Sequence, residues 1–115
     1  MEDKLRTGNP KLRVEFVRTK PKGSVGRFIR RKAESIFRRY PRLEGLRINV
    51  KREKQGSKSP RYIAQTRLIL PGHDRIVEKR ATAAFAAISE ALEVADRQLR
   101  KQAGILQGRP RNAAA

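Results

Sequence analysis

Cysteine is absent from this chain of 115 residues, and His73 is its one histidine. Without cysteine there can be no disulfide framework, thiolate metal site or cysteine nucleophile, and a reducing, cytoplasmic environment is the default expectation. His73 stands beside Asp74 in a sequence typical of a turn, with no second histidine to share a metal. The glycines are scattered singly, so they form neither a phosphate loop nor a dinucleotide fingerprint. We therefore predict no enzyme activity, no metal, no cofactor and no small-molecule substrate.

Long apolar segments are missing as well. A membrane-spanning helix needs about 18 or more predominantly apolar residues in succession, and no such run exists. The first residues, Met1 to Lys4, lack the apolar stretch of a signal peptide. No amphipathic helix has a bulky apolar face to spare for a bilayer. We therefore expect no membrane partner.

Acidic residues are scarce relative to basic ones. Eleven Asp and Glu stand against 29 Lys and Arg, which gives a net charge of +18, and residues 1–61 hold +14 of it. Such an excess repels itself in a folded chain unless a polyanion neutralises it, and surfaces that serve only solubility mix both signs. We therefore predict a nucleic acid as the partner.

Aromatic residues make up only 5% of the sequence. Four of them fall on the apolar sides of predicted helices, where we expect them in the core: Phe28, Phe37, Tyr40 and Phe85. A stacking platform for single-stranded bases is therefore poorly supported, and recognition of the RNA backbone and shape is favoured instead.

Hydrophobic periodicity predicts six elements. Strands are indicated by alternation with a period of two or by β-branched and aromatic residues, and helices by apolar residues three and four apart. In chain order we expect a strand at 12–17, a helix from a Ser24 cap to Tyr40, strands at 46–51, 62–70 and 75–79, and a helix from Thr82 to Gly104. This order predicts an α+β fold, β-α-β-β-β-α, with a four-stranded, mainly antiparallel sheet and two helices packed on one face.

The same patterns predict one domain. Residues 1–11 have no periodicity and are expected to form a basic flexible arm. Residues 12–103 are expected to form a single RNA-binding domain, in which 54–60 is a flexible basic loop. Residues 104–115 have little to bury and are expected to form a short disordered tail.

Basic side chains gather on the predicted helix faces that point away from the apolar stripes. At 100° per residue an arginine ridge forms on the first helix, and further basic residues lie on or just before the second helix. Arginine suits a nucleic-acid surface because its planar fork binds two phosphate oxygens at once. The acids of the second helix are expected to form surface ion pairs with basic residues four positions later, Glu93 with Arg97 and Asp96 with Arg100. The predicted RNA-binding residues are Arg27, Arg30, Arg31, Arg38, Lys79, Arg80, Arg97, Arg100 and Lys101.

The second helix also carries a family resemblance. Its run Phe85-Ala86-Ala87-Ile88, continued by Asp96-Arg97-Gln98-Leu99-Arg100-Lys101, resembles the last helix of the ribosome hibernation-promoting factor and ribosome-associated translation inhibitor family, which reads aromatic-x-Ala-Ile and then Glu/Asp-Arg-Gln-Leu-x-Lys. The predicted element order also matches that family's fold over residues 12–102. This chain departs from the family pattern at Ala83, where many members have an acid, and at Val94, where lysine is common.

The resemblance implies a short-form, cytoplasmic hibernation factor of the stress response, without the dimerisation domain of the long forms and monomeric off the ribosome. Such a factor would bind ribosomal RNA at the decoding region of the small subunit and inhibit translation by blocking messenger and transfer RNA sites. Two alternatives stay open. One is a general structured-RNA-binding or ribosome-assembly protein, and the other is a regulatory module that binds an acidic protein.

Overall fold

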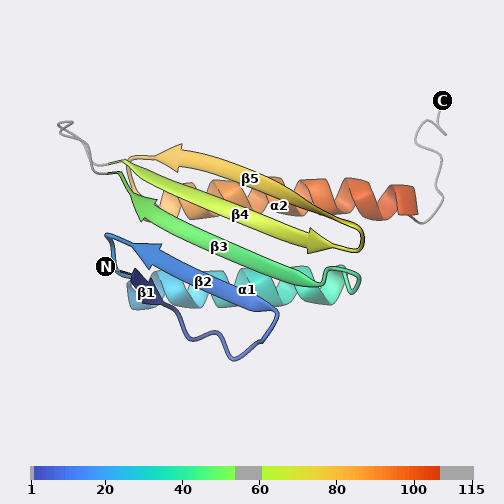
Figure 1. The fold of residues 1–115 in the computed structure, drawn as a ribbon, viewed down its shortest axis with the longest axis horizontal. Coiled ribbons are helices and arrows are strands. Elements are labelled where there is room, and N and C mark those ends of the chain that lie inside the picture. Colours follow the sequence, from blue (N-terminus) through green and yellow to red (C-terminus); the bar gives the residue numbers. More distant parts are fainter. Residues whose placement is uncertain (1, 54–60, 107–115) are drawn as a thin grey trace.

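The computed structural model describes residues 2–53 and 61–106, which form a five-stranded sheet and two helices (Figure 1). The elements in chain order are β1 (Glu2–Lys4), β2 (Leu12–Val17), α1 (Gly23–Arg39), β3 (Gly45–Arg52), β4 (Tyr62–Leu70), β5 (His73–Ala81) and α2 (Ala84–Leu106). The α+β class and the six predicted elements are confirmed. The predicted flexible loop at 54–60 and most of the predicted tail, residues 107–115, lie outside the described residues.

The sheet differs from the prediction in two respects. Its order is β1-β2-β3-β4-β5, so it has five strands, and it is mixed because β2 and β3 run parallel while the other neighbouring pairs are antiparallel. Parallel neighbours cannot be joined by a hairpin, and α1 is the crossover that connects them. The extra strand, β1, lies in the segment predicted as a flexible arm and pairs with residues 15–17 of β2. The prediction of a wholly flexible arm at residues 1–11 is therefore wrong.

The predicted hairpin between β4 and β5 is confirmed and is longer than expected. Its strands pair from Leu70 opposite His73 to Tyr62 opposite Ala81, so β5 extends beyond the predicted 75–79 at both ends. Pro71 and Gly72 form the turn, and Gly72 has a φ of +84°, a backbone conformation that glycine adopts without steric cost.

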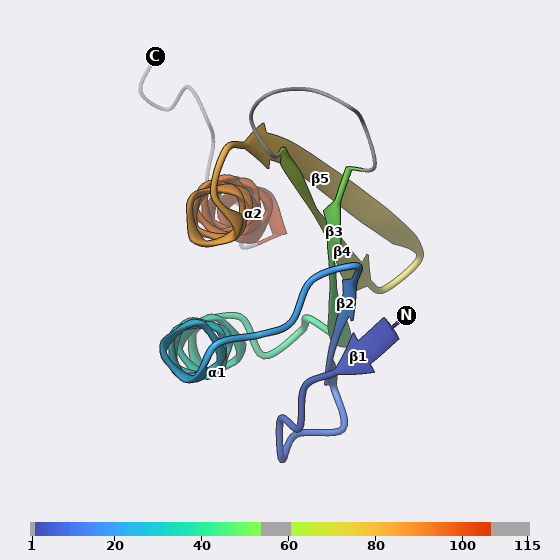
Figure 2. The same ribbon diagram turned by 90° about the vertical axis from the view of Figure 1, so that its left-hand side faces the viewer.

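Both helices cover one face of the sheet, as predicted (Figure 2). α2 packs over β4 and β5, and α1 lies beside α2 on the same side. Each strand of the β2–β4 region buries alternate residues toward the helices, while the residues between them face the opposite, open side of the sheet, which is the side seen in Figure 1. Fully buried large side chains join the two layers: Phe16, Ile29, Ile36, Leu46, Leu68, Ile88 and Leu92.

The helix ends differ slightly from the prediction. α1 begins at Gly23, its N-cap is Lys22, and no side chain caps it, so the predicted Ser24 cap is wrong. The helix starts earlier because the Gly26 amide already donates to the Lys22 carbonyl at 3.0 Å. α2 continues past Gly104 to Leu106, since one glycine costs a helix only about 1 kcal/mol. Within the described residues, neither helix is long and apolar enough to cross a membrane.

Candidate nucleic-acid interface

The outward face of α1 carries the predicted arginine ridge. Ile29, Ala33 and Ile36 are buried against the sheet, and the helical repeat therefore turns the residues between them to solvent. The four predicted arginines of this helix are all exposed: Arg27, Arg30, Arg31 and Arg38. Arg38 forms an ion pair with Glu34 at 3.7 Å, but both side chains are about 75% exposed, so the pair holds the arginine only weakly.

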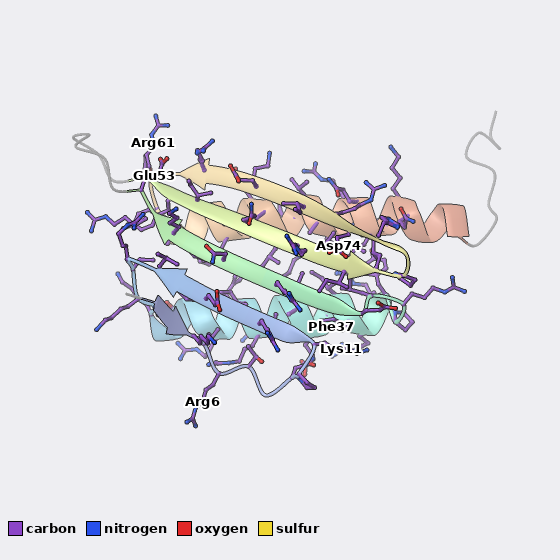
Figure 3. The ribbon with its side chains drawn as sticks, viewed as in Figure 1. Arg6, Lys11, Phe37, Glu53, Arg61 and Asp74 are labelled. Atoms are coloured by element: carbon purple, nitrogen blue, oxygen red, sulfur yellow. The ribbon has the colours of Figure 1, made fainter. Side chains whose placement is uncertain are left out.

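The N-terminal segment runs beside α1 and makes a pocket against part of this ridge. Arg30 Nε donates to the carbonyl oxygen of Arg6 at 2.9 Å, and the side chain of Arg6 extends away from the fold (Figure 3). A cavity of about 530 Å³ is lined by residues 7–10 on one side and by Arg27, Arg30, Arg31 and the acid Glu34 of α1 on the other. Three arginines around one cavity can donate to several oxygens of a phosphate group.

Side-chain hydrogen bonds shape the wall of this pocket. Asn9 Oδ1 accepts from the Lys11 amide at 2.9 Å, and the Thr7 hydroxyl accepts from the Asn9 amide at 3.2 Å. These bonds hold a turn in which Gly8 has a φ of +71°. The sequence signals the turn through Gly8-Asn9-Pro10, but nothing local indicates that it closes against α1, so the pocket was not predicted.

The predicted basic residues of α2 are also at the surface. Arg97, Arg100 and Lys101 are exposed. The expected pair between Asp96 and Arg100 is present at 3.7 Å. The expected pair between Glu93 and Arg97 does not occur within 4.0 Å, the limit for an ion pair, in the part of the chain that the structure describes.

Asp96 is buried rather than a surface acid, which corrects the prediction. Its carboxylate accepts a hydrogen bond from Arg39 Nη2 at 3.1 Å and another from the Tyr40 hydroxyl at 3.1 Å, so it ties α2 to the end of α1. Lys32 Nζ lies 4.0 Å from the same carboxylate. One acid thus pairs with three cations, Lys32 and Arg39 of α1 and Arg100 of α2. Of these, only Arg100 was predicted to belong to the interface. Lys32 and Arg39 are the functional candidates that sequence reasoning missed. We call this group the Asp96 cluster.

Lys79 and Arg80 come at the end of β5, close to the start of α2, but they face opposite sides of the sheet. Lys79 is half-buried and Arg80 is exposed. Arg80 lies 3.5 Å from Glu78 and 3.9 Å from Glu53, so two acids already neutralise it. The structure therefore does not bring Arg80 to the helix face with the other predicted residues, because successive residues of a strand point to opposite faces.

Phe85 was predicted in the core, but its side chain is 48% exposed. Its ring centroid lies 4.8 Å from that of Phe28, which is half-buried on α1. Phe28, Phe37 and Tyr40 pack against the core as expected. The beginning of α2 therefore presents an aromatic edge beside the two basic helix faces.

The fold and this surface define a class: a small α+β protein whose two adjacent helices present arginines on the side away from the sheet. Residues 12–107 match the model of the family described as Sigma 54 modulation protein / S30EA ribosomal protein. The chain belongs to this family, so the resemblance seen in the sequence of the second helix is confirmed and the protein is one of a ribosome-associated group. No curated protein matches the sequence.

Solved structures support the fold. A ribosomal subunit interface protein from Coxiella burnetii is similar with a TM-score of 0.58 and 12% identity, over 81% of this chain and 97% of that one. The N-terminal domain of Protein Y from Thermus thermophilus is similar with a TM-score of 0.57 and 22% identity, over 80% of this chain and 94% of that one.

Proposed function

We propose that this protein binds RNA of the small ribosomal subunit through the outward faces of α1 and α2 and inhibits translation by blocking the messenger and transfer RNA sites. The observation that carries the proposal is the side-by-side packing of two helices whose exposed arginines lie opposite the core (Figure 2). Family membership supports a ribosomal partner. The protein would act in the cytoplasm as a monomer.

The proposed binding residues are those predicted from the sequence, without Arg80, which faces the other side of the sheet: Arg27, Arg30, Arg31, Arg38, Lys79, Arg97, Arg100 and Lys101. Lys32 and Arg39 of the Asp96 cluster join them. Arginines that contact phosphates position a protein on RNA without reading sequence, so binding should depend on the shape of the RNA more than on its bases. Inhibition of this kind is stoichiometric, because blocking a site requires one protein for each ribosome.

Charge reversal on the ridge tests the proposal. The variant R27E/R31E/R38E changes three exposed side chains and should fold normally, since exposed substitutions move stability by only about ±0.5 kcal/mol. Its affinity for small subunits should fall at least about tenfold. The slope of log affinity against log salt should flatten by about 2, because each phosphate that is no longer neutralised accounts for about 0.7 of the slope. Sedimentation with purified subunits and a translation assay measure the affinity and the inhibition.

Two controls separate charge and folding from the interface. R42E/R52E/R61E makes the same change in net charge at exposed positions outside the helices, and it should retain most of the affinity. Ile36→Ala should lower the stability by about 2–5 kcal/mol through a core cavity and leave the ridge chemically unchanged. Equal loss of affinity in the two triple variants would show that net charge alone drives binding and would contradict the proposed interface.

A further inference from the structure

The open face of the sheet, opposite the helices, carries a row of three arginines. Arg13 of β2 lies opposite Arg47 of β3, and Arg47 lies opposite Arg67 of β4. All three are exposed. Neighbouring strands are about 4.8 Å apart, so the three side chains start from a line only about 10 Å long.

This row is poorly neutralised by the protein itself. Arg67 lies 3.9 Å from Asp74 of β5, which is labelled in Figure 3. Arg13 and Arg47 have no ion pair within 4.0 Å among the side chains that the structure describes, those of residues 4–53 and 61–102, so the open charge lies over β2 and β3. Like charges placed directly opposite each other destabilise a sheet, and an anionic ligand would remove that cost.

The neighbouring row adds hydrogen-bonding groups. Asn49 of β3 lies opposite Gln65 of β4, and Glu15 of β2 is registered beside Asn49. Glu15 lies 3.9 Å from Lys4, and Gln65 Nε2 donates to Glu78 at 3.4 Å, so this row carries little free charge. A hollow of about 230 Å³ spans the two rows and is lined by Arg13, Glu15, Arg47, Asn49, Gln65 and Arg67.

We propose that the open face is a second RNA site, which takes the phosphodiester backbone of a single-stranded RNA segment. Arg13 and Arg47 donate to phosphate oxygens, for which the planar guanidinium is suited. Asn49 and Gln65 each carry a donor and an acceptor, which match the ribose 2′-hydroxyl and base edges beside the backbone. The arginines supply the charge complementarity, and the carboxamides favour RNA over a purely anionic partner such as an acidic peptide.

The second site goes beyond the proposed function because it lies on the other side of the molecule. The helices and the open face are separated by the sheet (Figure 2), so the same short RNA strand cannot occupy both. A protein with both sites would bridge two RNA segments instead of covering one. Neither site depends on the other for its geometry, and the two can therefore be tested separately.

The test uses the full chain labelled with ¹⁵N and a single-stranded RNA of about ten nucleotides of mixed sequence. Titrations followed by NMR should shift the Nε–H signals of Arg13 and Arg47 and the carboxamide signals of Asn49 and Gln65. These shifts should persist in R27E/R31E/R38E, whose helix ridge is reversed. Adding R13E/R47E to that background should lower the remaining RNA affinity at least about tenfold and flatten the salt slope by about 1.4, for two phosphates.

The matched control adds R42E/R75E to the same background, which gives the same net charge with an intact open face. It should keep the open-face shifts and most of the affinity. Shifts confined to α1 and α2, or equal losses for R13E/R47E and R42E/R75E, would overturn this inference and leave the proposed function standing. If the open-face shifts persist but R27E/R31E/R38E binds ribosomes like wild type, the proposed function is contradicted and this inference stands. Open-face shifts with a polyglutamate peptide as strong as those with RNA would also overturn the assignment to RNA.

Discussion

Thr66 is a polar residue at the centre of the core. Its side chain is fully buried, and its hydroxyl finds no hydrogen-bond partner among the residues that the structure describes. An unsatisfied buried hydroxyl costs about 1–3 kcal/mol. We expect Thr66→Val, which keeps the branched shape and removes the hydroxyl, to raise the free energy of unfolding by about 1 kcal/mol.

Urea unfolding followed by circular dichroism measures this change. Thr66→Ser is the matched variant, because it keeps the hydroxyl and loses a methyl group, and it should be less stable than wild type. A Thr66→Val protein that is clearly destabilised would mean that the hydroxyl is bonded in the folded protein.

Asp96 is the acid that ties α2 to the end of α1. Asp96→Asn removes the charge that faces Lys32, Arg39 and Arg100 but retains a side chain of similar size. The three cations are then left close together without their acid, and we expect the free energy of unfolding to fall by about 1–3 kcal/mol. Glu34→Gln, in the exposed pair with Arg38, should change it by less than about 1 kcal/mol.

Thermal melts of both variants make the comparison. Equal, small effects would show that the Asp96 cluster is no stronger than a surface pair. The binding assay adds a second readout, since a cluster that positions Arg39 should affect RNA affinity more than the exposed pair does.

In the candidate interface, hydrophobic periodicity could predict which arginines are exposed. The ridge residues Arg27, Arg31 and Arg38 are exposed because the 100° repeat fixes which side of α1 meets the core. The role of Asp96 could not be predicted in this way. Asp96 and Arg100 are four residues apart, and an exposed ion pair on a helix has the same spacing, so the spacing does not indicate burial. The other partner, Arg39, is 57 residues away in the sequence.

Among the elements, the β4–β5 hairpin depends most visibly on a single residue. Gly72 has a φ of +84°, and a methyl group there would meet no other atom within 4 Å. Gly72→Ala should therefore act through the backbone alone and lower the free energy of unfolding by about 1 kcal/mol.

Gly72→Asn is the informative comparison, because asparagine tolerates a positive φ better than alanine. Chemical denaturation of both variants should give a smaller loss for asparagine. The reverse order would argue against a turn that requires this conformation.

The elements that the sequence predicted well are those with a strong period. β2, β3 and β4 alternate, both helices have an apolar stripe, and all five were located within a few residues. β1 was missed because three residues are too few to show a period. The parallel pairing of β2 with β3 was missed because pairing direction is set by where α1 crosses, and local patterns carry no information about that.

The whole molecule carries a net charge of +18, and this should appear in the salt dependence of binding. If the six exposed cations Arg27, Arg31, Arg38, Arg97, Arg100 and Lys101 each contact a phosphate, the slope of log affinity against log salt should be about −4 to −5. Sedimentation with small subunits between roughly 50 and 200 mM salt measures it. A slope near −1 would mean that few of these cations touch RNA.

The position of β1 at the edge of the sheet affects how the chain can be truncated. An edge strand offers unpaired backbone groups to any other strand, and β1, with the Leu5 amide donating to Val14 at 3.0 Å, covers the outer edge of β2 over residues 14–17. A truncated version that began at Leu12 would keep every fully buried apolar residue, losing only the partly buried Leu5 from the packing around the core, and would look like a complete domain. It would also uncover a strand able to join two molecules edge to edge. Dimers or larger aggregates of such a fragment would therefore be products of the truncation and would say nothing of the intact chain.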